Sequence, residues 1–336
     1  MNFKNKALLS FIALLCFSMC RYGIGYDYTA YKTLIVENRN YYEYDRLEYL
    51  SLLLIYASKL CSYEFFFIVS SFITLYPIYF VSKRSSVRPE LSLLIYYLNP
   101  FLFLDSLSVV RNAMAYSMFF IAFYFFTEKK IFFYFIFALI SSQFHYSGYI
   151  SFILPLFLKL TDKRNLHLLL FILSFFVGDI IVNAFGSFEG VFFIDKIGGY
   201  ANLGKDVGSQ KYLMILLAVI NFYFWNKLPK TYFYMQLKKA VNLGYCIYFV
   251  FIFDDTLSYR IANYFLLLTI LIFPSYIEIV AKRYRKLCFQ CIILFFLTLF
   301  SIMFFLMINS YINDPVRMNA LPYQTIFYHK DYTNYE

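Results

Sequence analysis

The segment SVVRNAMAYSMFFIAFYFF, residues 108–126, decides the fold class, because it is almost entirely apolar and carries one charge, Arg111, near its start. A helix that crosses the hydrocarbon core of a bilayer needs about 20 mostly apolar residues. Similar runs recur along the 336 residues, at 6–20, 47–60, 64–81, 91–104, 131–143, 147–158, 166–184, 211–226, 240–253, 259–278 and 287–309. The sequence therefore predicts an all-α, polytopic transmembrane helical bundle of about 10–12 membrane segments, some of them re-entrant or half-length.

The composition agrees with a lipid-facing surface. The chain is 61% hydrophobic and 24% aromatic, and only 15% of its residues are charged, whereas soluble domains carry about 25% charged residues. The net charge of +10 comes from Lys and Arg in short loops between apolar runs, not from a basic stripe on a soluble element. We therefore expect the bilayer as a partner and no nucleic acid.

The distribution of charge predicts the orientation. Six segments together hold 18 of the 30 Lys and Arg but only 3 of the 20 acids. They are residues 1–6, 82–90, 127–130, 159–165, 227–239 and 281–286. Cytoplasmic loops are enriched in Lys and Arg, so these segments are placed inside. The prediction is a multi-pass protein of the cytoplasmic membrane with a cytoplasmic N-terminus, whose first apolar run is an anchoring helix and not a cleaved leader.

This orientation shapes the rest of the chain. No repeat or linker is present, so residues 1–336 are predicted to form a single membrane domain. The loops 21–46 and 185–210 and the tail 310–336 then lie on the outer face. Run 47–60 must enter and leave on that face or lie in the interface. Runs 131–143 and 147–158 are short, so they predict a hairpin whose tip, near His145, points outward.

Two polar stretches stand out beside apolar runs on the outer side. RYGIGYDYTAY, residues 21–31, places Arg21 and Asp27 around two glycines that permit a tight turn. It is either part of a pocket or an interfacial turn with an Arg–Asp pair. Arg111 either binds an anion such as phosphate through its fork of donors, or extends to the interface, or pairs with nearby Asp105.

Two further sites share that side. His145, at the predicted hairpin tip, is either a proton acceptor or a hydrogen-bonded structural residue. Asp254 and Asp255 precede an apolar helix, where acids favour a helix N-terminus. That effect does not explain Arg260, which an anionic ligand would explain. If these outer residues converge, three arginines suit a diphosphate, and the nearby carboxylates or imidazole suit proton abstraction from a hydroxyl. No P-loop, His-Glu-x-x-His or Gly-x-Ser-x-Gly motif occurs, and no metal site is predicted.

These residues, in this order, resemble the EpsG family of Wzy-like polysaccharide polymerases. The likeness rests on RYGIGYDYTAY at 21–31, Glu43 before a short amphipathic segment, VRNAMA at 110–115, FHYS at 144–147, Arg260 followed by Tyr264, and LPY at 321–323. It covers nearly the whole chain. A fold of many helices with long outer loops also resembles the GT-C glycosyltransferases, by analogy.

The resemblance implies a membrane glycosyltransferase without a cofactor. It would polymerise oligosaccharide repeat units carried on undecaprenyl diphosphate into O-antigen, capsule or exopolysaccharide, with its active site facing the periplasm or exterior. A chain-length regulator protein is a further expected partner. The implied roles are His145, Asp27 or Glu43 as general base, Arg111, Arg260 and Arg21 as diphosphate ligands, and Asn112, Asp255 and Tyr31 as supporting residues.

Two other functions fit parts of the pattern. A flippase or transporter of lipid-linked sugars would show internal pseudo-symmetry and charges along a central path, neither of which the sequence shows. An O-antigen ligase-like transferase would use the same donor with another acceptor, so the arginine pattern does not distinguish it from a polymerase.

Overall fold

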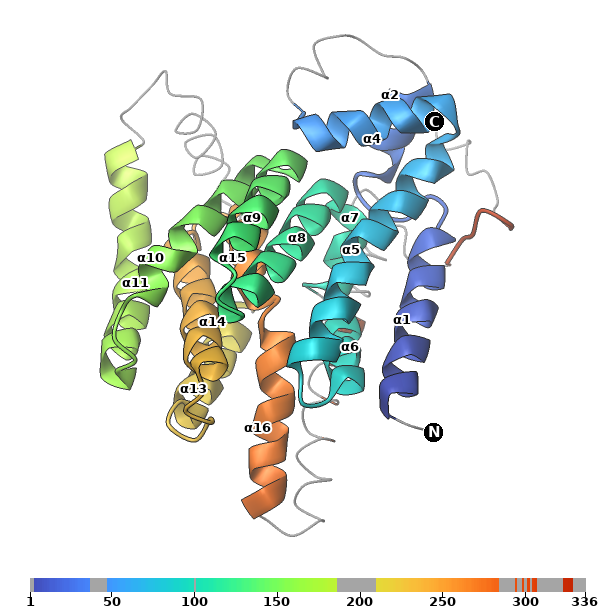
Figure 1. The fold of residues 1–336 in the computed structure, drawn as a ribbon. Coiled ribbons are helices and arrows are strands. Elements are labelled where there is room, and N and C mark those ends of the chain that lie inside the picture. The colour runs from blue at the N-terminus through green and yellow to red at the C-terminus, as the bar shows by residue number, and fades with distance from the viewer. Residues whose placement is uncertain are drawn as a thin grey trace. The chain divides into compact units, whose positions relative to one another are not determined.

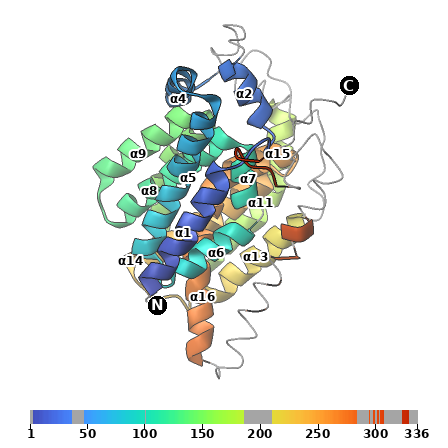
Figure 2. The same ribbon diagram turned by 90° about the vertical axis from the view of Figure 1, so that its right-hand side faces the viewer.

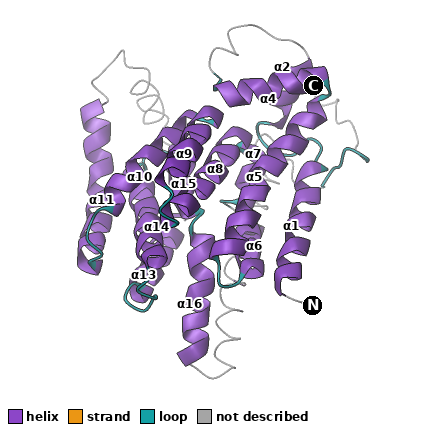
Figure 3. Ribbon diagram, in the orientation of Figure 1, coloured by secondary structure: helices purple, strands orange, loops and turns teal. Residues whose placement is uncertain are grey.

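The computed structural model describes residues 3–36, 47–99, 101–185 and 210–283, with short pieces of 294–306 and 323–328. Within these residues the regular structure is helical, as Figure 3 shows, which confirms the predicted all-α class. The helices are α1 (Phe3–Met19), α2 (Tyr28–Val36), α4 (Tyr49–Leu60), α5 (Tyr63–Ser85), α6 (Pro89–Leu98), α7 (Phe103–Ser108), α8 (Val110–Thr127), α9 (Ile131–Phe144), the 3₁₀ helix η1 (Tyr146–Ile153), α10 (Leu154–Leu158), α11 (Arg164–Phe185), α13 (Gln210–Phe224), α14 (Tyr232–Val250), α15 (Asp255–Leu266) and α16 (Thr269–Arg283).

The chain divides into two compact units. Unit 1 comprises residues 1–149 and 273–336, and unit 2 comprises residues 150–272. Two compact units can both belong to one membrane domain, so the predicted single domain stays a prediction.

Helix α8 is the centre of unit 1. Its sequence is apolar on nearly every side, and a helix of that kind is buried on all faces. Ala113, Ala115 and Ala122 are fully buried, as are the rings of Tyr116 and Phe119. Helices α5 and α9 pack along it, and Figures 1 and 2 show the three side by side. The apolar run at 108–126 thus forms a core helix, and Arg111 lies in its first turn.

Helix α4 has a different orientation from its neighbours. It lies crosswise to α1 and α5 in Figures 1 and 2 and contacts α2, α5 and α9. One face, with Leu54 and Ile55, is buried, whereas Leu53 and Tyr56 on the opposite face are more than half exposed. The prediction that run 47–60 enters and leaves on the outer face, or lies in the interface, stays a prediction.

Unit 2 is built on α14, which packs against α10, α11, α13 and α15. Two lysines near its start are almost completely buried. Lys238 Nζ lies 2.8 Å from the Asp162 carboxylate, and Lys239 Nζ donates to the carbonyl oxygens of Leu158 and Leu160. These bonds bring segments 159–165 and 227–239 together.

One described helix, Tyr63–Ser85, is long and apolar enough to cross a bilayer by itself. A second candidate is the pair Leu257–Leu266 and Thr269–Ala281, which is bent by 55° at its break. Six apolar stretches of helix among the described residues are shorter, at 10–17 residues. The prediction of 10–12 membrane segments therefore stays a prediction.

Candidate functional site

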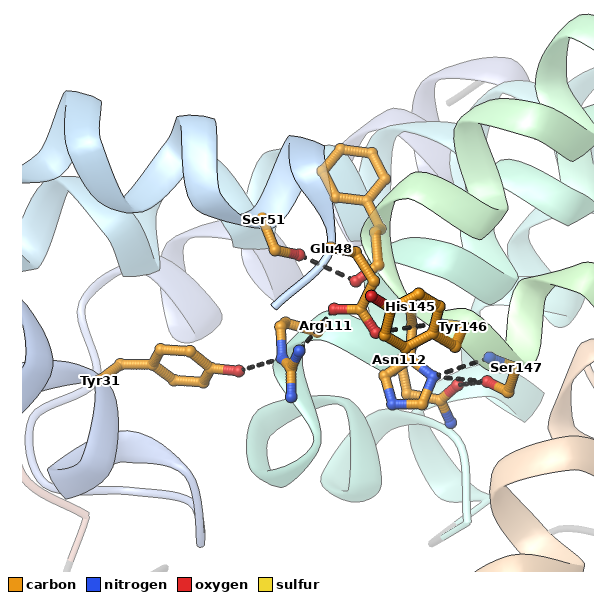
Figure 4. Close-up of polar contacts among 9 residues, drawn as sticks. Tyr31, Glu48, Ser51, Arg111, Asn112, His145, Tyr146 and Ser147 are labelled. Carbon is orange, nitrogen blue, oxygen red and sulfur yellow. Dashed lines mark hydrogen bonds and ion pairs between the residues drawn. The ribbon is translucent and has the colours of Figure 1, made fainter. Parts of the chain in front are cut away.

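Arg111 is the centre of the polar cluster in unit 1, which Figure 4 shows. Its Nε donates to the Tyr31 hydroxyl at 2.6 Å, and its Nη1 donates to Oε2 of Glu48 at 2.5 Å. The Arg111 side chain is 23% exposed. Its Nη2 donates to none of the residues that the structure describes. The guanidinium is therefore fixed in direction and still has donors for a ligand.

Glu48 connects Arg111 to the turn that carries His145. Its side chain is only 3% exposed, and its two oxygens have different partners. Oε2 accepts from Arg111, while Oε1 accepts from the backbone N–H of Tyr146 at 2.9 Å. A buried carboxylate is tolerated when it is paired and hydrogen-bonded, and Glu48 satisfies both conditions.

The chain turns at His145, where the sequence places the tip of the predicted hairpin. Helix α9 ends at Phe144, His145 is its C-cap with extended backbone, and η1 follows. The turn is tight, because a Cβ on Gly148 would lie 2.6 Å from the carbonyl carbon of Ser141. Only glycine allows the backbone to fold back this closely on the end of α9.

The His145 ring belongs to a short polar chain. Its Nδ1 lies 2.6 Å from Ser147 Oγ, and that hydroxyl donates to Asn112 Oδ1 at 3.0 Å. The backbone N–H of Ser147 also points at Nδ1, at 3.2 Å. The contact with the Ser147 hydroxyl suits a proton on Nδ1, whereas the contact with the Ser147 backbone N–H suits a lone pair on Nδ1. Asn112 directly follows Arg111 on α8, so the polar chain that holds His145 ends on the residue next to the arginine.

The loop between α1 and α2 packs against the residues just before Arg111. Gly25 has a φ of +106°, and a Cβ there would lie 2.0 Å from the Leu107 carbonyl oxygen. The backbone N–H of Asp27 donates to Ser108 O at 3.3 Å. The charge of Asp27 acts on both Tyr31 and Arg111. The glycine therefore lets Asp27 approach the cluster.

Arg21 lies apart from these contacts and is 2% exposed. Its Nη1 donates to Ser18 Oγ at 3.0 Å, and the guanidinium stacks over the Phe67 ring. Burial lowers the pKa of Arg21 to about 10, which leaves it charged near neutral pH. Its Nε and Nη2 have no partner among the described residues. Strand-like pairing of residues 20–22 with Gln324 and Ile326 covers this region.

The predicted residues of the Asp254–Arg260 stretch lie in unit 2. Asp254 is the N-cap of α15, and its carboxylate accepts from the Leu257 N–H at 2.6 Å. Asp255 opens the helix, and Arg260 lies within it. The interpretation of the two acids as a helix start is confirmed for Asp254. The expected approach of Arg260 to Arg111 stays a prediction.

Glu48 is the site residue that the sequence analysis missed, and the predicted Glu43 lies outside the described residues. Glu43, Asp45 and Glu48 occur within six residues, and spacing alone does not show which one faces inward. Its position in the sequence could have identified Glu48, because of the three acids it alone lies directly before the apolar helix α4. Of the predicted residues, Tyr31, Arg111, Asn112 and His145 lie in one bonded cluster.

The cluster offers a cation, an imidazole and a hydroxyl relay within one network. A guanidinium with an unused nitrogen can bind a phosphate oxygen, and an imidazole can accept a proton near neutral pH. The arrangement therefore suits transfer of a group away from an anionic leaving group to an attacking hydroxyl.

Comparison with known proteins gives one family. The family model described as the EpsG family matches residues 6–325 of this chain. No curated protein and no solved structure gave a match.

Proposed function

Because the chain belongs to the EpsG family, which indicates a polysaccharide polymerase, we propose that it is a membrane glycosyltransferase that joins repeat units carried on undecaprenyl diphosphate. The reaction takes place at the outer face of the cytoplasmic membrane. The observation that supports this most is the pair of bonds made by Glu48, whose buried carboxylate binds Arg111 and the backbone amide of Tyr146, the residue after His145.

The chemistry assigned to this network is a displacement at the anomeric carbon of the donor. A hydroxyl of the acceptor unit attacks this carbon, and a glycosidic bond forms. The bond between the anomeric carbon and the diphosphate oxygen breaks, and its electron pair leaves with the lipid diphosphate. The hydroxyl proton passes to a general base. Negative charge grows on the leaving oxygen, so a cation fixed beside it lowers the barrier.

Arg111 is proposed to bind the leaving diphosphate. Tyr31 and Glu48 hold its Nε and Nη1, which leaves Nη2 for phosphate oxygen. Burial raises the pKa of Tyr31, so its hydroxyl stays neutral and accepts from the guanidinium. Arg260 and Arg21 are proposed as further ligands. For Arg21 the support is the pair of buried nitrogens without a described partner.

His145 is the general base that the geometry favours. The backbone N–H of Ser147, 3.2 Å from Nδ1 of His145, fits a lone pair on Nδ1, whereas the shorter 2.6 Å contact with a Ser147 hydroxyl that donates to Asn112 fits a proton there. In the tautomer proposed for the reaction, which is the second, Nδ1 donates to Ser147. Nε2 then carries the lone pair that proton abstraction needs. Asp27, whose charge acts on Arg111, is the second candidate base.

The test replaces Arg111 and Arg260 separately with Ala in cells that make the polymer. Gel analysis of surface glycans should show loss of long chains and retention of lipid-linked single units, since removing a donor to a leaving oxygen lowers a rate about 10²–10³-fold. Arg88→Ala is the matched control, because Arg88 forms another partly exposed ion pair of unit 1, with Glu278 at 3.4 Å.

Three outcomes would contradict the proposal. Long polymer in the Arg111 variant would remove the assigned role of Arg111. Single units that accumulate on the inner face, and never reach the outer face, would favour a flippase. Capping of lipid A core by single units, with no polymer even in the unmodified chain, would favour a ligase.

A further inference from the structure

We infer that Glu48 is a positioning residue, which fixes Arg111 and the His145 turn against each other so that leaving-group binding and proton removal occur in one geometry. This inference rests on the proposed function. It concerns a residue that the sequence analysis did not select and that touches no reacting atom itself.

Glu48 joins three segments that are distant in the sequence. The carboxylate lies just before α4, the guanidinium that it binds is on α8, and the amide that it accepts from follows α9. Figure 4 shows the carboxylate between Arg111 and Tyr146. One buried side chain therefore sets the distance between the two functional residues of unit 1.

The directions of these bonds matter as much as their number. Glu48 occupies Nη1 of Arg111, and Tyr31 occupies Nε, so the guanidinium plane is held from two sides. An arginine side chain has many rotamers, and ordering it during each reaction cycle would cost conformational entropy. A preordered donor stabilises developing charge without reorganisation.

The same helix also carries a tether that does not touch Arg111. Ser51 is fully buried, and its Oγ donates to the carbonyl oxygen of Phe144 at 2.8 Å. This bond attaches α4 to the end of α9, one residue before His145. A Ser51 variant therefore tests the docking of α4 on α9 without removing the contact between Glu48 and Arg111.

The experiment is a double-mutant cycle on the full chain in proteoliposomes supplied with lipid-diphosphate-linked repeat units. Glu48→Gln, which keeps shape and removes the charge, should lower kcat about 10-fold or more, with a smaller change in KM. Arg111→Gln should lower it further. In the Arg111→Gln background, adding Glu48→Gln should lower the rate several-fold less than it does in the unmodified chain, because the contact with Arg111 is already lost and only the bond to the Tyr146 amide is left to disturb.

Ser51→Ala is the control, and it should change kcat less than about 2-fold. The positioning role would be overturned if Ser51→Ala lowered kcat as much as Glu48→Gln does. It would also be overturned if the fold-losses of kcat in Glu48→Gln and Arg111→Gln multiplied in the double variant. If Glu48→Gln does not fold, Tyr31→Phe takes its place, since it removes the other acceptor while keeping the stacking on Phe66. Unchanged kcat in that variant would also count against preordering of Arg111.

The outcomes separate the inference from the proposed function. Full activity in Arg111→Gln would overturn the assigned polymerase site itself. Loss of activity in Arg111→Gln with normal activity in Glu48→Gln would overturn only the role of Glu48.

Discussion

At the scale of single residues, the buried Arg111–Glu48 pair is better understood as a device for orientation than as a source of stability. Replacing a buried ion pair by apolar residues is often neutral, whereas removing one partner costs about 3–5 kcal/mol, because a buried charge is left uncompensated. Glu48 is nearly inaccessible and bonded through both oxygens. The pair therefore specifies where the guanidinium lies.

The first prediction concerns the loop that brings Asp27 to Arg111. Gly25→Ala should lower stability by more than about 3 kcal/mol, because strain at positive φ adds to a collision with the Leu107 carbonyl oxygen. Gly23→Ala, at φ +66° with no atom within 4 Å of the added Cβ, should cost only about 1–2 kcal/mol. Unfolding of the two purified variants in detergent measures the difference. Equal losses would show that the close approach of Gly25 contributes nothing.

A second prediction concerns the base. His145→Ala should reduce polymer formation about 10²–10⁴-fold. Ser147→Ala should reduce it less, because the imidazole remains but loses the contact that orients it. Ser147→Thr retains a hydroxyl and should restore most of the rate. Rates in proteoliposomes would test this order, and a fully active His145→Ala variant would shift the role to Asp27.

Part of this cluster was predictable from sequence, and part was not. Arg111 and His145 stand out because charged or titratable residues are rare beside apolar runs. Tyr31 and Asn112 follow from the motifs around Arg21 and Arg111. Glu48 was not predicted, because three acids lie close together in the sequence there, and the burial of Glu48 beside Arg111 follows from the tertiary packing of α4.

At the scale of elements, short and crosswise helices position the site. Helix α9 ends at Phe144, η1 turns back at Gly148, and α4 crosses near both. The half-length character of 131–143 and 147–158 was readable from their lengths. The 3₁₀ geometry of the second arm was not, because a run of mixed aromatic and small residues does not distinguish α from 3₁₀ structure.

A third prediction concerns the end of α10 in unit 2. Lys239 is 3% exposed and donates to the carbonyl oxygens of Leu158, the last residue of α10, and of Leu160, two residues beyond the helix. Lys239→Met should lower stability by about 1.5–3 kcal/mol, the contribution of a hydrogen bond to a charged group. Lys230→Met, on an exposed residue of the same segment, should stay within about 0.5 kcal/mol. Thermal unfolding of the two variants tests the difference, and equal midpoints would refute it.

At the scale of the whole molecule, the distribution of charge makes the strongest statement about topology. In unit 2, the Lys238–Asp162 pair joins two segments, 159–165 and 227–239, that the positive-inside rule assigns to the same side. The family match spans residues 6–325, so membership concerns the chain as a whole and not one segment.

A fourth prediction follows from this topology. A tag inserted within 185–210 should react with an impermeant reagent applied to intact cells, and a tag within 281–286 should react only after the membrane is opened. Labelling of both tags from outside, or of neither, would contradict the assigned orientation.

The most direct measurement is reconstitution of the purified chain in proteoliposomes with undecaprenyl-diphosphate-linked repeat units as the sole substrate. The account predicts that the wild-type chain forms polymer and releases one undecaprenyl diphosphate for each new glycosidic bond, and that Arg111→Ala abolishes both products together. Units that remain single with the wild-type chain, or polymer that forms equally well with Arg111→Ala, would contradict it.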